Sequence, residues 1–380
     1  MIKEIICFSY GDSNDISTWS NVPYLFTKTM ESKGIIVHRV NINVYANWWV
    51  GQIWNRILKP IINHIWPDNM YWYQKTPIAV YQVNKIIRKA VTKYNKSDYA
   101  IFMTYDFYNK FNNIPSILYC DVTFEMEKIG RRKQKPMFLE KALIRAQHEA
   151  ITHSQLVVPL FKKPAEELRS MGYTNIHCCD HYVINKIYDA PLNPQVIIAR
   201  KKQSNMILFI GNKKTYFRGA LMLVEAFRKL KSTNPDLELH IVAMVADDFE
   251  NLPEGVICHG YLHKDLEEER KIYYDLILGA RVICNPTPKW AGISSIMEAM
   301  YFYTPFIIAP FDDFKEYIGE SLDCGYFNEV FESLTLANNI QRMLNAKDYE
   351  QMALNAHEHV KDYTWDNFID WFIFEIEKAL

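Results

Sequence analysis

Three cations stand close together in the stretch Gly211–Gly219, namely Lys213, Lys214 and Arg218. They follow the apolar run 206–211, which has the composition of a strand, and they precede an amphipathic segment. A planar guanidinium can bind two phosphate oxygens, and a lysine adds a point charge beside it. The composition therefore predicts a pyrophosphate-binding loop, with a solvated basic loop as the alternative.

A second stretch with chemical potential runs from Cys284 to Pro310. It has the pattern of a strand ending near Cys284, a loop, a helix whose buried face carries apolar residues from Ile293 onward, and a strand over 306–309. Gly292 would let the backbone approach a ligand, and the helix start at Ile293, Ser294 and Ser295 would offer unpaired N–H groups to an anion. Ser294 and Glu298 lie four residues apart, on one side of that helix. The alternative is that Ser295 and Glu298 form a capping box.

Polar residues also follow the expected strands of the first half of the chain. Gly11–Asp15 follows the strand 2–10, Asp106 follows 99–104, and Asp121 follows 116–120. Ligands of open α/β sheets bind at the carboxyl ends of strands, so these carboxylates are candidates for gripping hydroxyls, although a loop Asp is commonly only a turn residue. Asp121 is the candidate that we carry forward.

The elements around these residues alternate as strand and helix in both halves of the chain, which predicts parallel sheets. Residues 189–205 carry prolines and lysines with weak periodicity, as a linker does, and the strand and helix pattern restarts at Met206. We therefore expect an α/β protein of two doubly wound, Rossmann-like domains. The cleft between two such domains is the default binding site.

Composition bounds the function further. The 380 residues have a formal net charge of -1, so no global basic field favours nucleic acid. Seven scattered cysteines match neither a metal spacing nor a disulfide framework, which favours a reduced, cytoplasmic protein. We find no metal-ligand motif, no secretory signal and no apolar run long enough to span a bilayer.

Residues 43–80 break the strand and helix rhythm. Five of the nine tryptophans fall here, together with Arg56 and Lys59. Such a segment could line an acceptor groove, rest on a membrane surface, or form an inserted helix packed on the domain. The sequence leaves these three interpretations open.

The second half resembles the nucleotide-sugar domain of family-4 glycosyltransferases, the retaining group 1 enzymes with the two-domain GT-B fold. The resemblance rests on Phe209-Ile210-Gly211, on Phe-Arg-Gly-Ala-Leu-Met-Leu-Val-Glu-Ala-Phe from Phe217, on His259-Gly260-Tyr261-Leu262, on Gly-Ile-Ser-Ser-Ile-Met-Glu-Ala-Met from Gly292, and on Tyr303-Thr304-Pro305. In the first half, the loop from Gly11 is similar to the glycine loop of the acceptor side, and the text from Asp121 is similar to a segment that lines the cleft.

The resemblance implies a role for each candidate. The catalytic residues would be Arg218 and Lys213, which would stabilise the leaving diphosphate, and Asp121, which would orient hydroxyls. The donor would be held by Gly11, Lys214, Gly292, Ile293, Ser294, Ser295 and Glu298, with Glu298 on the nucleotide ribose. Two positions depart from the family pattern: Asn212 stands where Arg is common, and Trp290 stands where the first of two paired glutamates is expected.

The resemblance thus implies metal-independent, retaining transfer of a sugar from a nucleoside diphosphate to a sugar, glycolipid or glycan hydroxyl, in cell-surface polysaccharide or glycoconjugate synthesis. We expect an acceptor domain over 1–188, a donor domain over 189–362, and a helix in 363–380 that crosses back to the first domain. The protein would be cytoplasmic, with possible contact at the inner face of the membrane. The alternatives are a non-catalytic GT-B partner subunit, suggested by Trp290 and Asn212, and a nucleotide-sugar epimerase.

Overall fold

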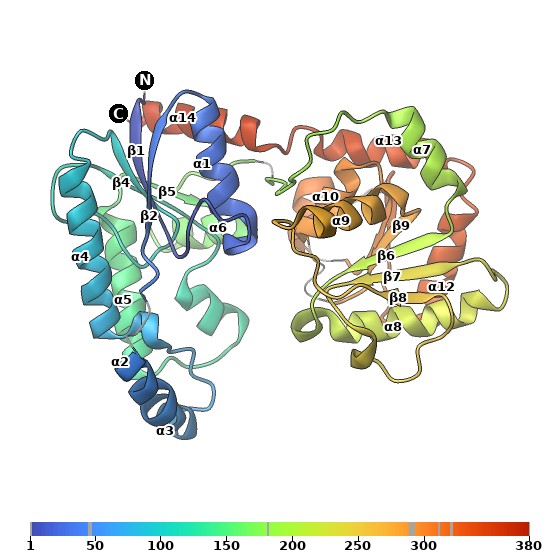
Figure 1. Cartoon of the computed structure of the whole chain (residues 1–380), viewed down its shortest axis with the longest axis horizontal. Coiled ribbons are helices and arrows are strands. Elements are labelled where there is room, and N and C mark those ends of the chain that lie inside the picture. The colour runs from blue at the N-terminus through green and yellow to red at the C-terminus, as the bar shows by residue number, and fades with distance from the viewer. Residues whose placement is uncertain are drawn as a thin grey trace. The chain divides into compact units, whose positions relative to one another are not determined.

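The structure is a computed structural model that describes residues 2–44, 48–180, 182–288, 293–310, 312–319 and 322–379. The chain divides into two compact units. Unit 1 comprises Met1–Tyr182 and Trp365–Leu380, and unit 2 comprises Val183–Thr364. Each has its own parallel sheet, drawn with its helices in Figure 1. The predicted α/β fold of two Rossmann-like sheets is confirmed.

The sheet of unit 1 has the strand order β2-β1-β3-β4-β5, with every pairing parallel. Its strands are β1 (Glu4–Ser9), β2 (Ile36–Asn41), β3 (Tyr99–Phe102), β4 (Ser116–Cys120) and β5 (Leu156–Pro159). Its helices are α1 (Val22–Ser32), α2 (Trp48–Ile53), α3 (Lys59–Ile65), α4 (Pro77–Lys93), α5 (Phe138–His153), α6 (Lys162–Ser170) and α14 (Trp365–Lys378). Shorter helical turns are η1 (Thr18–Asn21), η3 (Tyr73–Lys75) and the π-helical η2 (Trp54–Leu58) and η4 (Met126–Arg131).

Alternating side chains of the strands divide the core of unit 1 between two faces. Ile6 and Phe8 of β1 pack in one cluster with the buried faces of α4 and α5. On α1, Phe26 meets the rings of Tyr119, from β4, and Phe372, from α14. Helix α14 therefore completes the core of unit 1, although the whole of unit 2 separates it in sequence from the other elements of unit 1.

The sheet of unit 2 has the strand order β11-β10-β9-β6-β7-β8 and is also parallel. Its strands are β6 (Met206–Ile210), β7 (Glu238–Val242), β8 (Val256–Cys258), β9 (Val282–Asn285), β10 (Phe306–Ile308) and β11 (Gly325–Phe327). Its helices are α7 (Pro194–Gln203), α8 (Lys213–Lys231), α9 (Glu267–Gly279), α10 (Ile293–Tyr301), α11 (Asp312–Ile318), α12 (Ser333–Leu344) and α13 (Tyr349–Val360), with the turn η5 (Ala246–Asp248). Helices α8 and α12 pack side by side, and α13 packs against α7 and α10.

Two local predictions are wrong. The residues expected to be linker contain α7, and its Lys201 is buried, with Nζ bonded to the hydroxyl of Thr304 at 2.8 Å. Helix α8 begins at Lys213, inside the stretch expected to be a loop, because Asn212 caps it. Weak periodicity had hidden α7, since its buried face includes a lysine.

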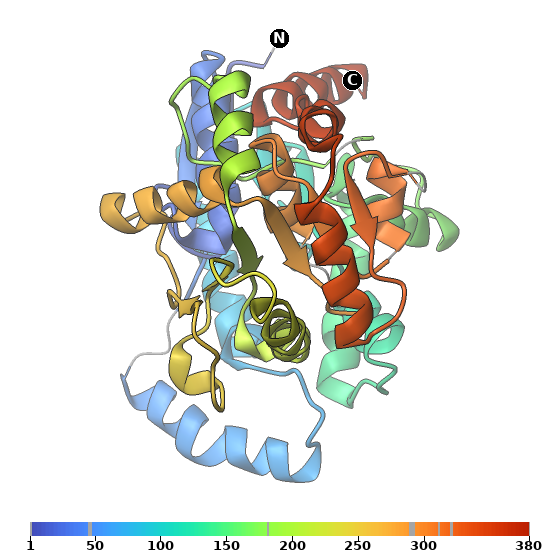
Figure 2. The ribbon, with the colours of Figure 1, turned by 90° about the vertical axis from the view of Figure 1, so that its right-hand side faces the viewer.

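Helices α2, η2 and α3 form a continuous helical rod at one end of unit 1, labelled in Figure 1 and seen along its length in Figure 2. Trp54 is buried on its inner side, between the rings of Tyr71 and Tyr73. The interpretation of this segment as an inserted helix packed on the domain is thus correct for one of its sides. In the part of the chain that the structure describes, no helix is both long and apolar enough to cross a bilayer.

Candidate active site

The loops that follow β6 and β9 lie together at the carboxyl edge of the second sheet. The two strands are paired neighbours, with Ile207 opposite Val282. Helix α8 then passes so close to the end of β9 that a Cβ on Gly219 would lie 2.1 Å from Oγ1 of Thr287. Only glycine allows that approach, since real Cβ contacts are essentially never shorter than 3.0 Å. The first stretch of cations and the residues directly after β9 therefore lie at one edge of the sheet.

The three cations of the first stretch are on helix α8 rather than in a loop, and they point in different directions. Nζ of Lys213 pairs with Asp248, after β7, at 2.8 Å, and this hydrogen bond lowers the pKa of that carboxyl. The guanidinium of Arg218 stacks on the ring of Phe331, after β11, at 4.7 Å. Since β7 and β11 lie on opposite sides of the pair β6 and β9, the side chains of Lys213 and Arg218 extend toward opposite sides of that pair. Lys214 is exposed in the first turn.

Asn212, which departs from the family pattern, has a structural use. Its side-chain oxygen accepts the backbone N–H of Thr215 at 3.0 Å, which satisfies one free donor of the helix start. An asparagine at this position thus stabilises the first turn of α8.

Ser294 and Glu298, both on helix α10, differ in their exposure to solvent. Ser294 is exposed at the start of the helix, whereas Glu298 is buried. The Glu298 carboxylate accepts hydrogen bonds from Nζ of Lys264, at 2.8 Å to each oxygen, and from the hydroxyls of Tyr273 and Tyr274, both at 2.9 Å. The capping-box interpretation is wrong, because Ser295 lies inside α10 and Glu298 bonds to side chains of other elements. Gly292 and Trp290 lie outside the described residues, and of Ile293 only the backbone is described.

The Glu298 site has its own electrostatics. Burial raises the pKa of Tyr273 and Tyr274 well above the usual value, and the nearby Glu298 carboxylate raises both further. Both hydroxyls therefore stay protonated and serve as donors at neutral pH. A carboxylate accepts about four hydrogen bonds, so a ribose hydroxyl would have to replace one of these donors or share an oxygen with it.

In unit 1, Asp121 lines a cavity of about 760 Å³ at the carboxyl edge of the first sheet. Its side chain accepts the N–H of Val122 at 2.7 Å. The wall of the cavity comes from the ends of β1, β3 and β4 and from the segment before α4, and includes Tyr10, Trp19, Trp72, Phe124 and Gln147. Aromatic faces with a few polar groups are the usual lining of a small-molecule site. Gly11 lies in the adjoining loop with φ 111°, and its N–H bonds to Asn41 at 3.1 Å.

The cavity also holds a buried ionic network around Asp106, one of the carboxylates that follow predicted strands. The Asp106 carboxylate accepts from the ammonium of Lys75, from the hydroxyl of Tyr10 at 3.1 Å and from the amide of Gln147 at 2.7 Å. Burial alone would raise the pKa of Asp106, but Lys75 and the hydrogen bonds outweigh it, so the pKa is lowered. A carboxylate after a strand was a usable sequence signal for Asp106. Nothing in the sequence indicated Lys75 or Gln147.

Among the described residues, one group has the geometry to hold a metal ion: Asp323, Cys324 and His359. Asp323 and Cys324 directly precede β11, at the amino edge of the sheet, opposite to the loops after β6 and β9, and His359 comes from α13. His359 and Asp323 already pair with each other at 2.8 Å. This group is separate from the candidate donor edge.

The sequence of unit 2 is similar to that of a known protein family. Residues 204–346 match the family model described as Glycosyl transferases group 1. Residues 204–346 are thus similar to glycosyl transferases group 1, and we call them the group 1 domain. Arg218, Gly219, Thr287 and Glu298 all lie within this group 1 domain, while the search of curated proteins finds no match to the chain.

Solved structures support the fold over the whole chain. Sucrose-phosphate synthase from Thermosynechococcus elongatus matches with 13% identity, a TM-score of 0.62 and 100% of each chain covered. Anabaena Alr3699/HepE, in complex with UDP and glucose, matches with 13% identity, a TM-score of 0.60 and 100% of each chain covered. The α,α-trehalose 6-phosphate synthase of Burkholderia multivorans matches with 9% identity and a TM-score of 0.62, over 100% of this chain and 99% of that one. The protein has the GT-B fold around its group 1 domain.

Proposed function

We propose that this protein is a retaining glycosyltransferase that moves a sugar from a nucleoside diphosphate to a hydroxyl, in the synthesis of a cell-surface polysaccharide or glycoconjugate. The observation that carries the proposal is the contact of Gly219 with Thr287, inside the group 1 domain. It brings the second turn of α8, which carries Arg218, beside the end of β9, where a diphosphate would meet cations and the first turn of α10. Relatives of the same fold are solved with UDP and glucose, which supports this donor class.

The donor diphosphate would bind between Arg218 and the N-terminal turn of α10, with Lys214 nearby. Stacking on Phe331 orients the plane of Arg218 while leaving its N–H groups available for phosphate oxygens. As the glycosidic bond breaks, the leaving diphosphate gains negative charge. Fixed donors and cations at that position would stabilise the transition state more than the ground state.

The acceptor would bind in the cavity of unit 1, where Asp121 and the aromatic walls face a volume of about 760 Å³. Aromatic rings pack against the apolar faces of a sugar, and a carboxylate accepts from its hydroxyls. Asp121 would therefore orient the attacking hydroxyl. The leaving phosphate would take the proton, so that no nucleophilic carboxylate and no metal ion are needed.

The deciding experiment is calorimetric titration of the protein with UDP, GDP, ADP and CDP. We expect one nucleotide to bind, and Arg218→Ala to weaken that binding by about tenfold or more because a bidentate phosphate contact is lost. The matched control is Arg228→Ala on the same helix, whose side chain bonds to Glu225 and Asn251. Equal affinities in the two variants would remove Arg218 from the site. No binding of any nucleotide would favour a non-catalytic partner subunit. If transfer is then observed, the anomeric configuration of the product, read by NMR, tests retention.

A further inference from the structure

The helical rod of α2, η2 and α3 is apolar on its outer side as well as its inner one. Ile53, Ile57, Ile61 and Ile65 recur every four residues and are 50%, 52%, 50% and 55% exposed. Leu58 and Trp66 are exposed beside them. The inner side already packs on unit 1 through Trp54, so the outer isoleucines are not needed to hold the rod in place. A row of large exposed apolar side chains marks an interaction surface.

The rod itself carries charge of one sign. No Asp or Glu occurs between Glu31 and Asp68, which is exposed just after the rod, whereas Arg56 and Lys59 are exposed on the rod. An apolar helix face with neighbouring cations and no acid on the same helix suits the interface of an anionic bilayer, where the apolar groups enter the acyl boundary and the cations meet lipid phosphates.

A second segment extends this surface. The loop between η4 and α5, taken together with the adjoining helical residues as segment 129–138, exposes the cations Arg131, Arg132, Lys133 and Lys135 and the apolar side chains of Ile129 and Phe138. It meets the rod through an edge-on contact of the rings of Trp66 and Phe138, 5.9 Å between centroids. We call the exposed residues of the rod and of this loop, taken together, the basic apolar surface.

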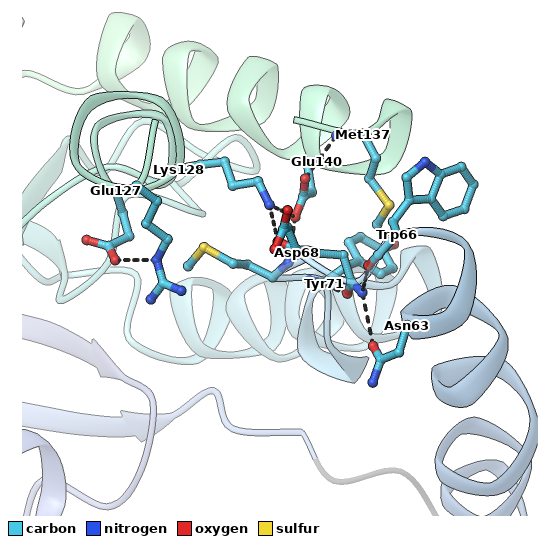
Figure 3. A network of polar contacts seen from close by, with 11 residues as sticks. Asn63, Trp66, Asp68, Tyr71, Glu127, Lys128, Met137 and Glu140 are labelled. Carbon is cyan, nitrogen blue, oxygen red and sulfur yellow. Dashed lines mark hydrogen bonds and ion pairs between the residues drawn. The ribbon is translucent and has the colours of Figure 1, made fainter. Parts of the chain in front are cut away.

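A buried ion pair fixes the two segments to each other, as Figure 3 shows. Lys128 and Glu140 pair at 3.4 Å, and each side chain is 1% exposed. Lys128 also donates to the carbonyl of Asp68, just after the rod, and Glu140 accepts the N–H groups of Met70 at 2.6 Å and Met137 at 2.9 Å. Because these contacts join the segment after α3 to the start of α5, the surface is part of the folded unit rather than a loose insertion.

The surface adjoins the cavity of unit 1. Met70 and Trp72, in the segment that follows the rod, line the cavity, and so does Glu127, which accepts from Arg132 of the basic loop at 2.8 Å. We propose that the basic apolar surface docks on an anionic lipid bilayer, and that the acceptor hydroxyl belongs to a molecule anchored in that bilayer. The second part rests on the proposed function, and the first part does not.

The test of docking is flotation of the full chain with vesicles. We expect binding to phosphatidylcholine vesicles that contain phosphatidylglycerol and much weaker binding to phosphatidylcholine alone. Ile57→Ser with Ile61→Ser should reduce binding by about tenfold or more, since two apolar anchors are lost. Lys133→Gln with Lys135→Gln should reduce it by about 25-fold, at roughly a factor of five for each cation.

The control variants replace residues of the same types at exposed positions outside the basic apolar surface. Ile272→Ser removes an exposed isoleucine from helix α9, and Lys85→Gln with Lys89→Gln removes two exposed lysines from helix α4. Both should bind vesicles as the parent does, and all variants should keep the parent's unfolding transition. Failure of the parent to float with anionic vesicles overturns the proposal, as does equal loss in control and test variants. A shift of the parent to a dimer that Ile57→Ser with Ile61→Ser abolishes, without vesicle binding, would assign the surface to a second copy of the chain instead.

Vesicle binding needs neither donor nor acceptor, so its failure is separable from failure of the proposed function. For the acceptor, transfer to endogenous acceptors in isolated membranes should fall with vesicle binding in the Ile57→Ser and Ile61→Ser variant, while its nucleotide affinity stays that of the parent. Unchanged transfer to membrane acceptors would overturn the membrane-anchored acceptor and leave the docking surface intact.

Discussion

Two buried carboxylates, Asp106 in unit 1 and Glu298 in unit 2, are held by similar donors but in different ways. Each is bonded to one lysine and to two neutral side chains. The donors to Asp106 come from three separated parts of the chain and meet at the wall of a cavity. Two of the three donors to Glu298 are consecutive residues of α9, and the third, Lys264, lies just before that helix. The Asp106 network joins distant elements of unit 1, whereas the Glu298 network holds α10 beside α9.

The largest effect should come from Asp106→Asn. The substitution leaves the ammonium of Lys75, whose side chain is 11% exposed, without its counter-charge, and breaking such a pair costs about 3 kcal/mol. Urea denaturation measures the change in the free energy of unfolding. Asp236→Asn, at an exposed turn, is the control and should stay within about 0.5 kcal/mol of the parent. If the two variants are equally stable, the network does not stabilise unit 1.

Substitutions at Glu298 and Lys264 test whether Glu298 only stabilises unit 2 or also binds the nucleotide. Glu298→Gln and Lys264→Met both break the ion pair and should each cost about 2 kcal/mol. If Glu298 holds the ribose, nucleotide affinity falls by about tenfold in Glu298→Gln only, because Lys264→Met keeps the carboxylate and removes a competing donor. Calorimetry on both folded variants decides. Equal losses of affinity would make the carboxylate a purely structural partner of Lys264.

Gly219→Ala tests the donor edge without changing any charge. The new Cβ would meet Oγ1 of Thr287 at 2.1 Å, so α8 and the end of β9 must separate, at about 1 to 3 kcal/mol of stability. Nucleotide affinity should fall as well. Gly130→Ala, where nothing lies within 4 Å, is the matched control. Adding Thr287→Ala should recover part of the loss, and no recovery would contradict the steric explanation.

The smallest effect concerns pH. The folded-state pKa of Asp106 is lowered, so its network contributes fully above the unfolded-state value of about 3.9 and is lost as the pH falls through the lowered pKa. The difference in unfolding free energy between the parent and Asp106→Asn should therefore be constant near neutral pH and shrink under acid conditions. Denaturation series at several pH values give this difference. If this difference in unfolding free energy grows as the pH falls, the pKa of Asp106 is raised in the folded state rather than lowered.

The sequence by itself determined the class of fold and the region of the candidate donor edge. The hydrophobic periods of strands and helices depend on neighbouring residues, so the alternating pattern predicted two parallel sheets. The group 1 motifs lie at the ends of β6 and β9. The roles assigned to Arg218, Lys213, Lys214, Ser294, Ser295, Glu298, Asp121 and Gly11 remain predictions. Lys213 and Arg218 could not be told apart in the sequence, because they differ in the side of the strand pair toward which each extends.

Only the tertiary structure decided which side chains surround each carboxylate and which face of the aromatic segment stays exposed. The partners of Asp106 lie 96, 31 and 41 residues away, and Lys128 reaches Asp68 over 60 residues. Such contacts depend on sheet order and on the packing of whole helices, and no local period encodes them. The outer isoleucines of the rod show the same limit, because an apolar residue in a helical pattern predicts a buried face, and here the fold supplies a partner for only one of two apolar faces.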